Sequence, residues 1–90
     1  LELSINYLYL DQNKIEVVKN HYFKNLICLT HLSLNKNTIS AIESDSFKDL
    51  VSLTVLVLSD NCLFHIDSSI FSNLKTLEAL HLSRNVIRKI

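Results

Sequence analysis

Apolar residues recur at intervals of 24 along the whole chain, with no insertion or deletion between the copies. The first half of each copy reads Leu-x-x-Leu-x-Leu, as at Leu29, Leu32 and Leu34, with Ile5 in place of the first leucine in the first copy. Residues two apart share one face of a β-strand. A strand that returns every 24 residues in the same phase must return in the same direction. The pattern therefore predicts a solenoid with one short parallel strand per repeat.

The second half of each copy keeps apolar residues at wider spacing, as at Ile39, Ile42, Phe47 and Leu50. This half is rich in serine and aspartate, which favour caps and turns over helix interiors. We expect irregular turns here, with at most one short helical or 3₁₀ turn. The alternative is an amphipathic helix in each repeat.

The repeats predict a single array over residues 1–90, with copies starting near residues 5, 29, 53 and 77. The chain begins and ends within a copy, so we interpret it as an internal piece without capping segments. Open ends would expose the apolar rungs around Leu8 and Leu80. Such ends favour self-association.

An asparagine follows the last strand leucine by three residues in every copy, at Asn13, Asn37, Asn61 and Asn85. An amide side chain both donates and accepts hydrogen bonds, so it can join the turn backbones of adjacent coils. We expect these four residues to form a ladder along the solenoid. The alternative is a row of solvated turn residues.

Composition narrows the class of protein. Nine basic residues balance nine acidic ones, and no block of either charge favours nucleic acid or an anionic membrane. The apolar runs are too short to span a bilayer. Two cysteines, Cys28 and Cys62, occupy different phases of the repeat, so geometry disfavours a disulfide between them. The sequence has no metal-binding motif and implies no cofactor.

The motif LxxLxLxxNxL, followed by an apolar residue, a phenylalanine and a leucine, resembles the leucine-rich repeat family in its 24-residue form. The resemblance covers essentially the whole chain. It implies an α/β leucine-rich-repeat solenoid, or horseshoe, with a mostly irregular convex side. Repeats with phenylalanine at this position, here Phe23, Phe47 and Phe71, resemble those of extracellular arrays such as Toll-type receptors. The resemblance thus implies an extracellular or cell-surface ectodomain that takes part in signalling, as in innate immunity.

One departure from the family pattern concerns the turns, because the chain has no glycine and no proline. Where the family favours glycine before the leucine that follows phenylalanine, this chain has Asn25, Asp49 and Asn73. Asparagine and aspartate tolerate a positive φ better than other non-glycine residues. We therefore predict a left-handed backbone at all three positions.

The variable strand positions are expected to project onto the concave face, where equivalent positions become lateral neighbours. Tyrosines beside exposed valines resemble the hot spot of a protein interface, although valines are also ordinary strand formers. The predicted ligand-binding residues are Tyr7, Tyr9, His31, Ser33, Val55, Val57 and His81. After the end of each strand, Lys36, Asp60 and Arg84 carry side-chain charges of alternating sign on neighbouring coils. This favours a cross-strand charge ladder that contributes little to stability.

No serine, histidine and acid are placed to form a catalytic constellation, so we do not expect an enzyme. His31 and His81 lie in different columns and are not expected to share a metal. The sequence favours recognition of a protein ligand through the concave face of a receptor ectodomain. A structural or adhesion spacer and an intracellular protein-interaction scaffold remain the alternatives.

Overall fold

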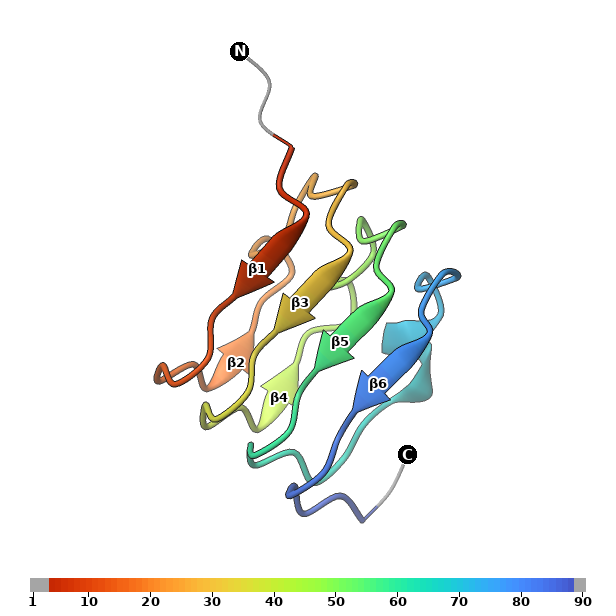
Figure 1. Ribbon diagram of the computed structural model, residues 1–90. Coiled ribbons are helices and arrows are strands. Elements are labelled where there is room, and N and C mark those ends of the chain that lie inside the picture. The colour runs from red at the N-terminus through yellow and green to blue at the C-terminus, as the bar shows by residue number, and fades with distance from the viewer. Residues whose placement is uncertain (1–3, 89–90) are drawn as a thin grey trace.

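The computed structural model describes residues 4–88 and shows four short strands side by side in one parallel sheet (Figure 1). They are β1 (Tyr7–Tyr9), β3 (His31–Ser33), β5 (Val55–Val57) and β6 (Ala79–His81). Each strand pairs with the strand one repeat later, so that Leu8 lies opposite Leu32 and Leu32 opposite Leu56. The prediction of a parallel solenoid with one such strand per repeat is confirmed.

A second, two-stranded parallel sheet lies on the other side of the first two coils (Figure 1). It consists of β2 (Val17–Val18) and β4 (Ala41–Ile42). The prediction of a mostly irregular convex side is confirmed, but it did not include this two-residue pairing. The stacked coils bring these segments into parallel register, and β-branched residues favour the extended conformation.

The third coil carries a single 3₁₀ turn, η1 (Ser68–Phe71), in the half where such a turn was predicted. Asp67 caps it, because its Oδ1 accepts a hydrogen bond from the backbone N–H of Ser69 at 3.0 Å. This bond lowers the pKa of Asp67. Ile70 is the buried residue of this turn, and its side chain belongs to the hydrophobic core.

The core lies between the two sides of the coils and repeats the same residue types along the solenoid. Phe47 is fully buried and stacks between Phe23, at 6.2 Å between ring centroids, and Phe71, at 6.4 Å. The strand leucines Leu32, Leu34, Leu56 and Leu58 are also buried. Burial declines toward both ends, where Leu8 is only partly buried and Leu80 is 38% exposed.

The left-handed turns agree with the residue-type prediction at only one of three positions. Among the three predicted positions, Asn25 has a positive φ of 66°, but Asp49 and Asn73 do not have one. The other left-handed residues share one repeat position, directly before the ladder asparagine: Gln12, Lys36, Asp60 and Arg84. The chain turns sharply there on leaving the strand, so the path of the coil sets this φ at the same position in every coil.

Within residues 4–88, no helix has the length and apolar character needed to cross a membrane.

Candidate functional site

The outer face of the four-stranded sheet brings the variable strand positions together, because the register places them in straight columns. Tyr7 lies opposite His31, and His31 opposite Val55. In the next column Tyr9 lies opposite Ser33, and Val57 opposite His81. We call this surface the outer sheet face.

Three aromatic rings gather at the β1 end of the outer sheet face. The rings of Tyr7 and Tyr9 stack, with centroids 6.4 Å apart and an angle of 8° between the planes. The ring of His31 lies 4.7 Å from that of Tyr7. Its Nδ1 lies 3.0 Å from the hydroxyl of Thr30, which fixes the position of the imidazole. Tyr7 and Tyr9 are nevertheless 58% and 64% exposed, so they form a positioned but open aromatic patch.

The remaining predicted site residues differ in accessibility. Val55 and Val57 are half-buried, and Ser33 is only 6% exposed. The small Ser33 side chain stands in register between the larger Tyr9 and Val57, so its hydroxyl offers little surface to a partner. His81 is exposed on β6, at the opposite edge of the sheet from the tyrosines. The most accessible predicted residues are therefore the two tyrosines on β1 and, separated from them, His81 on β6.

Three of the ladder asparagines, Asn37, Asn61 and Asn85, follow the strands and join consecutive coils. Asn61 donates through Nδ2 to the carbonyl oxygens of Leu34 and Leu58, at 3.0 and 3.1 Å. Its Oδ1 accepts a hydrogen bond from the backbone N–H of Ile39 at 3.0 Å. Asn37 and Asn85 make the corresponding bonds, each to the backbone of its own coil and to that of the preceding coil. These bonds hold the ends of neighbouring strands at a fixed spacing.

A charged strip follows the strands at the position with positive φ. Arg84 donates from Nε to Asp60 Oδ1 at 2.6 Å and from Nη2 to Asp60 Oδ2 at 2.9 Å. These hydrogen bonds hold the pKa of Asp60 below its ordinary value and raise that of Arg84. Lys36 adds only a weaker Coulombic contribution to the pKa shift of Asp60. The predicted charge ladder is thus a two-residue ion pair within the described part of the chain.

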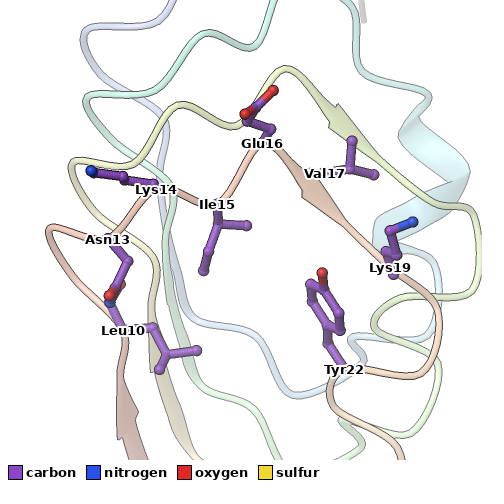
Figure 2. Close-up of a pocket in the computed structure, with 8 residues that line it drawn as sticks. All are labelled: Leu10, Asn13, Lys14, Ile15, Glu16, Val17, Lys19 and Tyr22. Atoms are coloured by element: carbon purple, nitrogen blue, oxygen red, sulfur yellow. The ribbon is translucent and has the colours of Figure 1, made fainter.

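A hollow of about 630 Å³ opens at the β1 end of the solenoid (Figure 2). It is lined by Leu10, Asn13, Lys14, Ile15, Glu16, Val17, Lys19 and Tyr22. Sequence reasoning anticipated an open apolar rung at this end but did not anticipate a hollow beside Tyr22, because Tyr22 occupies a non-repeating position.

The remaining chemically reactive side chains do not assemble into a site. Cys28 and Cys62 are free and exposed. His21 and His65 are both exposed, on the side of the coil opposite the main sheet. No three histidine, cysteine, aspartate or glutamate residues between residues 4 and 88 are grouped to hold a metal ion. The outer sheet face is therefore the candidate functional site.

The fold defines a class of protein, the repeat solenoids with one parallel strand per coil. Within this class, the model of the family described as "Leucine rich repeat" matches residues 4–63 and 52–90. The chain belongs to the leucine-rich repeat family.

Two solved structures illustrate the likeness. The leucine-rich repeat domain of APL1B is 31% identical, with a TM-score of 0.79 over 92% of this chain and 23% of that one. The TLR13-ssRNA13 complex contains a chain that is also 31% identical, with a TM-score of 0.68 over 89% of this chain and 14% of that one. This chain therefore spans less than a quarter of the length of either. No curated protein matches it.

Proposed function

We propose that this chain recognises a protein partner through the outer sheet face, which we expect to be concave, and that it catalyses no reaction. Leucine-rich repeat domains generally mediate protein interaction, and the family is typically non-catalytic. The observation that carries the proposal is the pair of stacked, largely exposed tyrosines, with His31 beside them, on a sheet held rigid by the asparagine ladder.

Three properties support this patch as the centre of the contact. Tyrosine is enriched among the residues that dominate binding energy at interfaces. Rings already fixed by stacking lose little conformational freedom on binding, so their contact area stabilises a complex efficiently. The half-buried Val55 and Val57 continue the apolar surface beside the rings. A partner with an apolar or aromatic side chain flanked by hydrogen-bonding groups fits this combination.

The proposed setting is a receptor ectodomain at the cell surface or outside the cell, with a signalling role such as innate immunity. The phenylalanine-containing repeats and the similarity to a TLR13 chain support this setting. That neighbour is in complex with RNA. For this chain we favour a protein ligand, since the net charge is zero and the described outer sheet face lacks a basic cluster.

Binding can be tested with an array of extracellular and membrane-protein ectodomains probed with this chain. Tyr7→Ala and Tyr9→Ala together should weaken each specific interaction about tenfold or more. Tyr22→Ala is the matched control, because Tyr22 is a similarly exposed tyrosine, at 45%, that lies away from the outer sheet face. Circular dichroism should show the same fold for both variants.

The outcome separates the proposal from its alternatives. Binders that survive the double substitution but are lost with Tyr22→Ala would reject the outer sheet face as the site. A folded chain that binds none of the ectodomains would favour a structural or adhesion spacer. Specific binding to intracellular proteins alone would favour the scaffold.

A further inference from the structure

Hydrogen bonds join the first and second coils on the side of the solenoid opposite the outer sheet face. The N–H of Ser40 donates to the carbonyl oxygen of Glu16 at 2.9 Å. The carbonyl oxygen of Val18 accepts two bonds, from the N–H of Glu43 and from the buried hydroxyl of Ser46, each at 2.9 Å. The second coil is therefore held closely against the first on this side.

The equivalent backbone bonds are missing between the second and third coils, although both coils lie wholly within residues 4–88. The N–H of Phe64 does not donate to Ser40, and the N–H of Asp67 does not donate to Ile42. The third coil is joined to the fourth again, since the N–H of Arg88 donates to the carbonyl oxygen of Phe64 at 2.9 Å. The interruption is thus internal to the array.

The residue at position 70 gives a physical reason for the interruption. Ile70 holds the repeat position of Ser46 and is only 5% exposed. It has no hydroxyl that could donate to the carbonyl oxygen of Ile42, and it is bulkier than serine. It also lies in η1, a 3₁₀ turn that the second coil does not have. The two coils part on this side, and we call the opening the back seam.

The back seam is an apolar hollow of about 270 Å³ with one acidic residue among those that line it. Its apolar walls include Ile42, Leu63, Ile66 and Ile70. Phe64 also lines it and is 55% exposed, and the acidic residue is the exposed Asp67. None of the described lysines and arginines lines it. Small-molecule pockets typically measure ~300–1,000 Å³, so this hollow suits a single side chain of a partner.

The groups in the back seam match the parts of an arginine side chain. Apolar walls suit its aliphatic stem, and the exposed ring of Phe64 offers a face on which a guanidinium stacks. The Ser69 N–H bond lowers the pKa of Asp67, so its carboxylate is charged at neutral pH. The carbonyl oxygens of Ser40 and Ile42, which accept no bond from Phe64 or Asp67, suit the remaining guanidinium donors.

We propose that the back seam binds an arginine side chain on the surface of a protein partner. The site lies on the opposite side of the coils from the outer sheet face, so the two do not compete for one surface (Figure 1). A lysine would bring a more strongly hydrated charge with no planar group to stack. An aliphatic side chain would leave the carboxylate and the two carbonyls without a donor.

NMR titration of the ¹⁵N-labelled chain with the peptide acetyl-Ala-Arg-Ala-amide tests the proposal. The amide signals of Ser40, Phe64 and Ile66 should shift. The affinity should exceed that for the same peptide with lysine or leucine at its centre by about fivefold or more. Signals of Tyr7 and Tyr9 should move less than those of the back seam.

A charge variant tests the role of the carboxylate. Asp67→Asn removes the charge but keeps a residue that caps helical turns well, so η1 should persist. It should weaken binding of the arginine peptide about fivefold or more. Asp45→Asn is the control, because Asp45 is an exposed acid on the same side of the second coil that does not line the back seam. It should leave the affinity unchanged.

Two further variants test the hollow itself. Ile70→Ser gives the third coil the hydroxyl that Ser46 supplies in the second, so it should close the seam and abolish binding. Phe64→Leu keeps an apolar wall without the ring and should weaken binding about threefold or more. If Ile70→Ser does not fold, Phe64→Leu and Asp67→Asn decide.

Four results would overturn the proposal. One is a titration in which the back-seam signals do not shift at the highest soluble peptide concentration. Another is equal affinity for the arginine peptide and for the lysine or leucine peptide. The third is an equal effect of Asp67→Asn and Asp45→Asn. The fourth is unchanged binding to a folded Phe64→Leu chain. Loss of binding at the outer sheet face leaves all four measurements unaffected, so the two sites are tested separately.

Discussion

Asn61 donates its side-chain amide to the carbonyl oxygen of Leu34, 27 residues earlier in the sequence, at 3.0 Å. The same amide nitrogen also bonds the carbonyls of its own coil, and its Oδ1 accepts from Ile39. One buried side chain thus satisfies backbone groups from two coils. An unpaired buried polar group is costly, so the asparagine ladder stabilises the stacked coils by pairing their buried backbone groups, as the leucine core does by burying apolar surface.

The first prediction concerns this ladder. Asn61→Ala leaves buried backbone groups of both coils unpaired, at ~1–3 kcal/mol each. The free energy of unfolding in urea should fall by more than for Asn13→Ala, because Asn13 is exposed and bonds only its own coil. Measurements belong at low protein concentration, where association does not contribute. Equal losses for the two variants would contradict the ladder as an inter-coil support.

A second prediction concerns the phenylalanine column. Phe47 is fully buried between two other rings, so Phe47→Ala should cost ~3–5 kcal/mol through lost burial and a cavity. Phe71 is only partly buried, and Phe71→Ala should cost less. Chemical denaturation of both variants compares the two losses. A larger loss at Phe71 would mean that the core is centred elsewhere.

The ion pair predicts a pH effect. Hydrogen bonds from Arg84 lower the pKa of Asp60 in the folded chain below its value of about 3.9 in the unfolded chain. The folded state therefore binds this proton less readily. The contribution of the pair to stability is present above the unfolded pKa and is lost as the pH falls through the folded one.

Carboxyl-carbon NMR titration measures this shift directly. Arg84→Ala should raise the pKa of Asp60 toward its ordinary value, whereas Lys36→Ala should move it less, since its Coulombic contribution is the smallest of the causes. If the two substitutions move the pKa equally, the hydrogen bonds are not its main determinant.

The left-handed turn after the strands provides a fourth prediction. Lys36 has a φ of 57°, a conformation that β-branched residues strongly disfavour. Lys36→Ile should destabilise the fold by ~1–2 kcal/mol, while Lys36→Asn should be tolerated. Lys48→Ile is the control, because Lys48 does not have a positive φ. Thermal unfolding curves of the three variants give the comparison, and similar losses for Lys36→Ile and Lys48→Ile would contradict it.

Residue type was a poor guide to these turns. Asparagine and aspartate at Asn25, Asp49 and Asn73 suggested a positive φ, but only Asn25 has one. The recurring left-handed position carries glutamine, lysine, aspartate and arginine, most of which do not favour it intrinsically. The closure of each coil imposes this φ, and the ladder and core stabilise it. A local preference of at most ~1–2 kcal/mol per residue is easily overridden.

The solvent exposure of the candidate site residues could not be predicted from the sequence either. The period placed Tyr7, Tyr9 and Ser33 on the same face, and the register agrees with it. The sequence could not show that Ser33 is covered while the tyrosines stay open, because burial depends on the size of neighbours in adjacent strands. The stacking of Tyr7 on Tyr9 and the contact with His31 likewise arise only from the paired strands.

The sequence alone determined the family, the parallel strands, their register and the core columns. An unbroken 24-residue period fixes which residues must repeat their environment, whatever the details of the turns. The tertiary structure alone decided most of the positive φ values, the small second sheet, which two charges of the predicted ladder pair, and the stacking of the tyrosine rings. These features depend on how adjacent coils meet, and side chains 24 residues apart become neighbours only when the coils stack.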